Sequence, residues 1–249
     1  MKIGIIADIH EDVASLTEVL RILGHQGCEM LVCLGDILGF DGQHYGFGHA
    51  ADGDECIRLV RENCAVAVAG NHDLFAIRKV PCFTAGFSYD NDWYTRKRID
   101  RLALGKGRLW SYCEREESRL LKDESLDFLD QLPEFHTLNH DGMTIHCAHF
   151  LYPDLSGSTT RLPRWVPDLW PHLSWMKKQE CTTGFSGHAH MEKMLTGSWY
   201  SLHGSDKPVH TLTRARSWFT CPPVVSGNVR SGFLILDTVL QTINLHFIG

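Results

Sequence analysis

Five apolar runs along the chain each end in polar residues of the types that bind metals, and this pattern constrains the fold more than any other feature. The run KIGIIA ends at Asp8 and His10, and the run AVAVA is followed at once by GNHD, residues 70–73. Packed polar groups at the edge of a core are costly unless something gathers them. The other three runs, MLVCL, MTIHCA and TTGFS, end at Asp36, at His149, and at His188 and His190. We therefore expect one site where the ends of these runs meet.

The order of apolar runs and helical periods predicts a mainly parallel α/β fold in the first half. Leu16, Leu20 and Leu23 recur at helical spacing after Asp12, a residue type that caps helices, and DECIRLVREN is a second predicted helix. Strands that alternate with helices form βαβ units. The second half returns to short strands, namely MTIHCA, TTGFS, KMLTGSW, VHTLT, GFLILD and INLHF. We predict one domain over residues 1–249, an α/β sandwich of two sheets with helices outside and the site at the carboxyl ends of the strands.

Two stretches interrupt this pattern. The first, at about 80–132, is rich in charged and aromatic residues and is expected to form helices outside the sheets. The second, at about 150–180, is rich in Pro and Trp, and a loop of that length is usually functional or partly helical. Arg161 and Arg164 lie in it and are weak candidates for a bidentate phosphate clamp, against the simpler interpretation of solvated surface charge. Its tryptophans are expected to pack the loop, with a wall for a nucleobase as the alternative.

Composition limits the partners and the compartment. A net charge of −6 and a pI near 6.2 argue against stable nucleic-acid binding. No apolar run approaches the ~20 residues of a membrane-spanning helix, and the first ten residues are typical of a strand rather than a signal peptide. The nine cysteines form no C-x-x-C pair, which is typical of free thiols in a reducing compartment. We expect a cytoplasmic protein without a membrane partner, and the sequence leaves its oligomeric state open.

The spacing and chemistry of the candidate ligands favour metal ions. Asp8 and His10 are two residues apart, so on an extended backbone they face the same way, and His188 and His190 repeat this spacing. Carboxylates, imidazoles and one amide, without a thiolate, suit manganese, iron or zinc better than calcium or a lone magnesium ion. Seven ligands are too many for one ion, but two ions that share a bridging carboxylate would use them all. The seven are Asp8, His10, Asp36, Asn71, His149, His188 and His190.

Taken in order, five motifs resemble the signature of the calcineurin-like metallophosphoesterase superfamily. They are D-x-H, G-D-x-x-G in the form GDILG, G-N-H-D, a strand-terminal His, and G-H-x-H. The chain is most similar to the small bacterial branch of phosphodiesterases and diadenosine-tetraphosphatase-like proteins. The resemblance implies a four-layer αββα fold and a hydrolase of phosphoester or phosphoanhydride bonds, in which a metal-bound hydroxide attacks phosphorus. It implies two divalent ions, manganese first and iron, zinc or nickel as alternatives, and a small phosphorylated substrate, with nucleotides among the candidates.

The resemblance also implies a role for each site residue. His72 would stabilise the developing charge or protonate the leaving oxygen, and Asp73 would orient His72. The seven ligands would divide into two sets of three and one bridging residue: Asp8, His10 and His190; Asn71, His149 and His188; and Asp36 as the bridge.

Three alternatives stay open. The fourth-motif ligand is either His146 or His149, and we favour His149 because it follows the complete apolar run. GDILGFDG lacks the arginine of the GDYVDRG form found in serine/threonine protein phosphatases, which makes that activity the weaker interpretation. A non-catalytic scaffold of the same fold, such as the retromer subunit of this superfamily, would be expected to lose ligands, whereas this chain retains them all.

Overall fold

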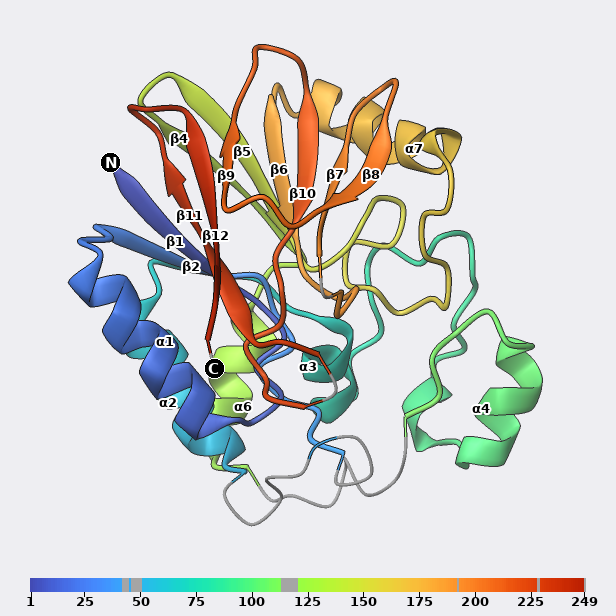
Figure 1. Ribbon diagram of the computed structural model, residues 1–249. Helices are drawn as coiled ribbons and strands as arrows, with labels where there is room; N and C mark the ends of the chain where they lie inside the picture. Colours follow the sequence, from blue (N-terminus) through green and yellow to red (C-terminus); the bar gives the residue numbers. More distant parts are fainter. Residues whose placement is uncertain (42–44, 46–50, 113–120, 192, 228, 249) are drawn as a thin grey trace.

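Two six-stranded sheets packed face to face form the centre of the protein in this computed structural model (Figure 1). The structure describes residues 1–41, 45, 51–112, 121–191, 193–227 and 229–248. The strand order is β3-β2-β1-β11-β12-β9 in the first sheet and β4-β5-β6-β10-β7-β8 in the second. Each sheet therefore combines strands from distant parts of the chain, and the predicted two-sheet architecture is confirmed.

The first half of the chain folds as its patterns predict. The Asp12 carboxylate caps the first helix by accepting a hydrogen bond from the Ser15 N–H at 2.9 Å. The first three strands pair in parallel, and only the third is much shorter than its apolar run. The elements are β1 (Lys2–Ile6), α1 (Val13–His25), β2 (Met30–Cys33), α2 (Gly53–Asn63), β3 (Val66–Ala67) and α3 (Asn71–Ala76).

The middle of the chain contains the helices expected there, while residues 113–120 lie outside the described part. These helices are η1 (Trp93–Thr95), α4 (Arg98–Gly105) and α6 (Asp123–Gln131). The Pro- and Trp-rich stretch is partly helical, because it contains α7 (Val166–Lys178). Asp168 fixes the start of α7 by accepting hydrogen bonds from the N–H groups of Arg164 and Trp165.

The second half contains three strands that the sequence patterns did not indicate, β4 (Phe135–His140), β8 (Leu202–Ser205) and β10 (Ser217–Thr220). Strands β4 and β8 form the two edges of the second sheet, where fewer apolar residues are required, and β10 is short. The predicted strands of this half are β5 (Met143–Ala148), β6 (Thr183–Ser186), β7 (Met194–Gly197), β9 (Val209–Thr211), β11 (Gly232–Asp237) and β12 (Thr242–Phe247).

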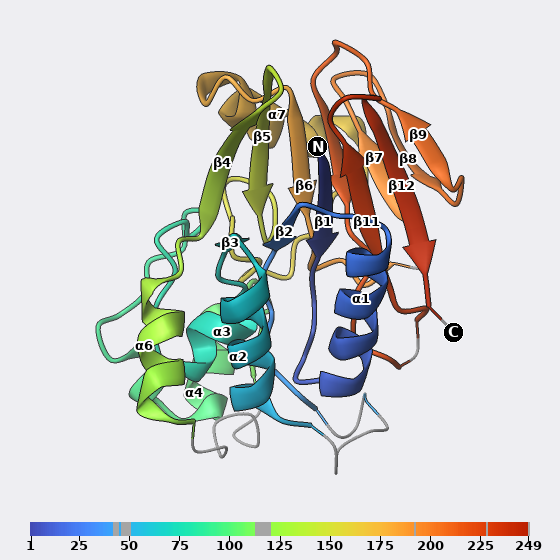
Figure 2. The same cartoon turned by 90° about the vertical axis from the view of Figure 1, so that its left-hand side faces the viewer.

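Three buried apolar clusters divide the molecule into four layers. Leu16 of α1 packs in a cluster with Phe233 on the outer side of the first sheet. Ile5 and Phe185 belong to a second cluster, between the two sheets. The third cluster joins α7 to Trp218 of the second sheet. Because burial of these faces drives the packing, the result is the expected αββα sandwich, with helices outside both sheets (Figure 2).

The carboxyl ends of the parallel strands point towards one edge of the sandwich. In both views β1, β5 and β6 run in the same direction towards the centre of the molecule (Figures 1 and 2). Strands β5 and β6 are parallel to each other, as are β1 and β2. The loops after these strands therefore lie together, at the position where open α/β sheets bind ligands.

The described ranges contain neither a disulfide nor a membrane-spanning segment. All eight cysteines within them are free, and Cys113 lies outside them. No helix there is both long and apolar enough to cross a bilayer.

Candidate metal centre

Five of the seven predicted ligands adopt the left-handed backbone conformation. This conformation costs about 1–2 kcal/mol for a residue other than glycine. Strained residues that cluster in this way are typical of functional sites, where the surrounding structure holds them in place. The five residues and their φ angles are Asp8 (55°), His10 (46°), Asp36 (52°), His188 (67°) and His190 (44°).

The loops after β1 and β6 bring together the first set of ligands. Asp8, His10 and His190 each offer one ligand atom, and these atoms lie within 4.8 Å of one another. His190 Nε2 is 3.2 Å from Asp8 Oδ1 and 3.0 Å from His10 Nε2. His10 Nδ1 contacts the Gly39 carbonyl oxygen at 3.2 Å, which leaves Nε2 directed towards this set. One carboxylate and two imidazoles thus converge on a single point.

The loops after β2, β5 and β6 bring together the second set. Asp36, His149 and His188 offer ligand atoms that also lie within 4.8 Å of one another. His149 Nδ1 donates to the Leu34 carbonyl oxygen at 2.8 Å, so its Nε2 faces the centre, 3.0 Å from Asp36 Oδ2. The hydrogen bond to Leu34 fixes the ring orientation as it does in many metal sites.

Asp36 lies between the two sets. Its Oδ2 is 4.0 Å from His10 Nε2 in the first set and 3.0 Å from His149 Nε2 in the second. Its Oδ1 accepts a hydrogen bond from the His72 N–H at 2.9 Å. His10, Asp36 and His72 also form a third group of converging ligand atoms. The carboxylate is therefore placed to contact ions in both sets.

Three buried polar atoms test whether the site fits metal ions. Asn71 Oδ1 and His188 Nε2 make no hydrogen bond within the described part of the chain, and His149 Nε2 has only the Asp36 carboxylate beside it, at 3.0 Å. A buried polar atom without a partner costs about 1–3 kcal/mol, so native proteins rarely retain one without a ligand. All three are good donors to a divalent cation. The chemistry of the centre therefore fits bound metal.

The pKa shifts of the buried residues also indicate that the centre fits bound metal ions. Burial, together with neighbouring imidazoles, lowers the pKa of His10 to about 3 and that of His188 to about 3. Burial alone would raise the pKa of Asp36, but His149 and His72 hold it well below its usual range. Burial would lower the pKa of His149, but Asp36 raises it to about 9. The centre thus holds buried carboxylate charge beside the neutral imidazoles of His10 and His188, and in the absence of metal the protonated His149 supplies the positive charge that a cation would provide.

A comparison with known protein families agrees with this geometry. The family model of the calcineurin-like phosphoesterase superfamily domain matches residues 1–204 of this chain. The chain belongs to the calcineurin-like phosphoesterase superfamily. Members of this superfamily include phosphoester hydrolases that use divalent metals.

Individual relatives give the extent of the similarity. A protein of Methanocaldococcus jannaschii, described as uncharacterised, is 28% identical to this chain over 162 residues. The match covers 61% of this chain and 54% of that protein. The chain therefore spans about half the length of this relative. A metallophosphoesterase from Sphaerobacter thermophilus superposes with a TM-score of 0.63 at 21% identity, covering 100% of this chain and 88% of that one. A hypothetical protein from Pyrococcus horikoshii superposes with a TM-score of 0.60 at 12% identity, covering 99% and 87% of the two chains. At these identities the two structures show the shared fold alone.

Two glycines of the superfamily motifs are required by close approach at the centre. A Cβ atom on Gly70 would lie 2.1 Å from Asp36 Oδ1. A Cβ atom on Gly187 would lie 2.6 Å from Asp8 Oδ2. The glycines before Asn71 and His188 therefore leave room for the two carboxylates, in addition to allowing a tight turn.

The structure gives Asp73 a role beyond the expected one of orienting His72, which stays a prediction. Its carboxylate accepts hydrogen bonds from four backbone N–H groups at 2.8–3.1 Å, those of Asp36, Ile37, Leu38 and Gly70. These bonds join the loop after β2 to the loop before α3. Asp73 thus holds the backbone of Asp36 in its left-handed conformation, a function that a motif pattern does not distinguish from contact with a neighbouring side chain.

The structure separates the two candidates for the fourth-motif ligand. His146 lies in the middle of β5, and its buried ring is 5.2 Å from that of His172 on α7 and 5.7 Å from that of Phe135. His149 lies one residue beyond β5 and belongs to the second ligand set. The structure thus brings His149, and not His146, to the centre.

The two loop arginines lie at the start of α7. Arg161 Nη2 is 3.2 Å from Asp168 Oδ1, and the Arg161 side chain is 79% exposed. Arg164 is exposed, and its backbone N–H donates to the same carboxylate. A phosphate clamp by either residue stays a prediction.

Several aromatic side chains that no motif predicted surround the metal centre. They come from stretches outside the strands, where sequence patterns say least about position. The ring contacts, by centroid distance, are Tyr45 on His10 (5.3 Å), Tyr112 on His72 (5.0 Å), Phe150 on His188 (4.6 Å) and Trp110 near His188 (6.2 Å).

Proposed function

We propose that the protein is a hydrolase of phosphoester or phosphoanhydride bonds that uses two divalent metal ions, with manganese as the first candidate and iron, zinc or nickel as alternatives. The observation that carries this proposal is the convergence of six of the seven expected ligands, together with the buried atoms Asn71 Oδ1 and His188 Nε2, which have no hydrogen-bond partner within the described residues. Bound ions would lower the pKa of water and offset charge on phosphoryl oxygens. One ion would be held by Asp8, His10 and His190, the other by Asn71, His149 and His188, with Asp36 shared between them.

His72 and Asp73, the remaining residues of the GNHD motif, would act on the substrate and on the loops, respectively. The His72 ring lies against those of His10 and Tyr112, each at a centroid distance of 5.0 Å, and is partly exposed. A partly exposed imidazole beside the centre is suited to donate a proton to the leaving oxygen or a hydrogen bond to the phosphoryl group. Asp73 acts one step away, because it holds the backbone that carries Asp36.

The alternatives have less support. A scaffold has no need for a strained and desolvated donor set that costs folding free energy, and this chain keeps all seven donors and His72. A serine/threonine protein phosphatase would be expected to carry the arginine that GDILGFDG lacks. The proposed substrate is therefore a small phosphorylated molecule rather than a phosphoprotein.

Hydrolysis of bis-p-nitrophenyl phosphate tests the proposal. Protein stripped with a chelator should be inactive and should recover turnover when Mn²⁺ is supplied. Asp36→Asn should lower kcat/KM at least 100-fold, whereas Asp130→Asn, on an exposed carboxylate of α6, should leave it unchanged. Turnover that survives chelation, or full activity of Asp36→Asn, would overturn the proposal. The proposal would also be overturned if metal-loaded protein hydrolysed neither this diester nor p-nitrophenyl phosphate.

A further inference from the structure

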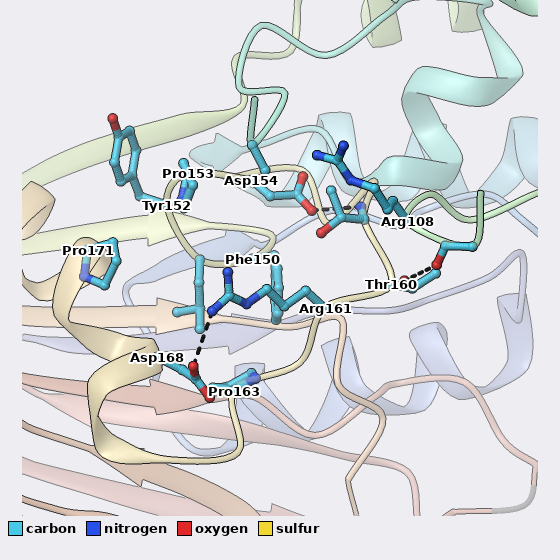
Figure 3. Close-up of a pocket in the computed structure, with 14 residues that line it drawn as sticks. Arg108, Phe150, Tyr152, Pro153, Asp154, Thr160, Arg161, Pro163, Asp168 and Pro171 are labelled. Atoms are coloured by element: carbon cyan, nitrogen blue, oxygen red, sulfur yellow. Dashed lines mark hydrogen bonds and ion pairs between the residues drawn. The ribbon is translucent and has the colours of Figure 1, made fainter. Parts of the chain in front are cut away.

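A cavity of about 300 Å³ lies beside the metal centre, and none of the superfamily motifs contributes to its wall (Figure 3). Its apolar lining includes Phe150, Pro163 and Pro171, and its charged lining includes Arg108 and Asp168. A volume of this size is at the lower end of the range found for small-molecule sites. The cavity is therefore large enough for one ring system of a ligand.

The cavity and the metal centre share a wall. Phe150 lines the cavity, and its ring is 4.6 Å from the ring of the proposed ligand His188. The chain beyond Phe150 also packs on this imidazole, because a Cβ atom on Gly157 would lie 2.6 Å from His188 Nδ1. Thus one side chain separates the cavity from a ligand of the second metal set.

Two paired segments connect the cavity to the centre. The N–H of Thr160 donates to the Arg108 carbonyl oxygen at 3.0 Å, and the N–H of Trp110 donates to the Ser158 carbonyl oxygen at 3.1 Å. Arg108 and Thr160 line the cavity, whereas the Trp110 ring lies 6.2 Å from that of His188. The pairing therefore fixes Arg108 relative to the metal centre.

The chemistry of the wall selects one kind of occupant. Apolar side chains line much of the cavity, the Arg108 guanidinium offers donors at one end, and the Asp168 carboxylate offers an acceptor at the other (Figure 3). Asp168 pairs with Arg161, and Arg108 makes no ion pair within the described ranges. In Figure 3 the Arg108 and Arg161 side chains extend in the same direction from neighbouring loops. A bare phosphate would leave the apolar lining unused, and a hydrocarbon would make no use of the exposed Arg108 guanidinium, which lies 5.8 Å from the centre of the Phe87 ring.

We propose that this cavity binds the nucleobase of a nucleotide substrate, with Arg108 donating hydrogen bonds to the base. A nucleobase has apolar faces for Phe150 and the prolines, and its rim carries donors and acceptors that Arg108 at one end and Asp168 at the other could bind. Its sugar and phosphate would extend past the shared wall to the metal centre. This inference rests on the proposed function, because it assigns the phosphorus end of the ligand to that centre.

Equilibrium binding measurements distinguish recognition of the nucleobase from recognition of the phosphate. Titration calorimetry would compare adenosine 5'-monophosphate with ribose 5-phosphate, on both Mn²⁺-loaded and chelated protein. We expect the nucleotide to bind at least tenfold more tightly than the sugar phosphate in the loaded protein, because only the nucleotide reaches the cavity. Arg108→Ala should remove most of this preference, and Arg108→Lys should restore only part of it, since lysine lacks the planar fork of donors. Arg21→Ala is the matched control and should change nothing, because Arg21 forms an exposed ion pair with Glu18 on α1 and does not line the cavity.

A kinetic comparison keeps the two proposals distinguishable. The p-nitrophenyl ester of thymidine 5'-phosphate and bis-p-nitrophenyl phosphate share a leaving group and differ in the group that would enter the cavity. Arg108→Ala should raise KM about tenfold for the thymidine ester and leave bis-p-nitrophenyl phosphate unaffected. Equal binding of nucleotide and sugar phosphate, or an Arg108→Ala protein with wild-type preference, would overturn the nucleobase site while the hydrolase stands. Loss of all hydrolysis with Arg108-dependent nucleotide binding intact would overturn the hydrolase alone.

Discussion

Replacement of Asp73 by alanine should destabilise the protein more than a typical surface substitution. The Asp73 carboxylate is 1% exposed and accepts four backbone N–H groups from two loops. A hydrogen bond contributes about 1 kcal/mol, and more when one partner is charged. Four such bonds amount to roughly 4 kcal/mol, and relief of repulsion with the nearby Asp36 carboxylate offsets part of this loss. We expect Asp73→Ala to lower the free energy of unfolding by about 3 kcal/mol.

Urea unfolding of chelated protein, followed by circular dichroism, measures this change. Asp130→Ala is the control, because Asp130 forms an exposed ion pair with Lys79 at 3.1 Å and should contribute less than about 1 kcal/mol. Mn²⁺ affinity should fall together with stability in Asp73→Ala, since the backbone of Asp36 is released. If Asp73→Ala instead unfolds at the wild-type urea concentration and only the pH profile of kcat changes, Asp73 orients His72 and our interpretation is wrong.

Three further predictions concern the histidines. His149→Ala should bind about one metal ion fewer per chain by elemental analysis, while His146→Leu should keep the wild-type metal content. His188→Ala should reduce the rise in melting temperature that Mn²⁺ produces in the wild-type protein, because it removes a ligand of one of the two ions and a bound ion stabilises only the state that binds it. Burial lowers the pKa of His146 from 6.5 to about 4, so below about pH 6.5 the unfolded chain takes up the proton first and stability falls towards pH 4. His146→Leu should therefore remove roughly 2 kcal/mol of the wild-type loss between pH 7 and pH 5 in urea unfolding, and an unchanged pH dependence would contradict this.

The sequence predicts most of the metal centre because its ligands follow regular elements. An apolar run indicates where a strand ends, and parallel strands end at the same edge of a sheet, so Asp8, Asp36 and His149 must lie close together. Their detailed backbone conformation was not predictable, because the left-handed conformation of Asp8 and Asp36 depends on tertiary contacts that compensate for its cost.

The features that the sequence did not predict depend on contacts between distant loops. Strand β4 has little alternation because it lies at an edge of its sheet. The backbone contacts of Asp73 join the loops after β2 and β3, which are far apart in the sequence. Arg108 lies in no motif, and it reaches the cavity through pairing with Thr160, 52 positions later in the chain. Periodicity describes the neighbours of a residue along one element and carries no information on such pairings.

The central claim is that this chain holds two metal ions close together between its two ligand sets. Electron paramagnetic resonance of chelated protein titrated with Mn²⁺ tests it most directly. We predict saturation at two ions per chain, with the closely spaced multiline spectrum of an exchange-coupled pair, and loss of that spectrum in Asp36→Asn. Saturation at one ion, or only the six-line spectrum of isolated Mn²⁺, would contradict the claim.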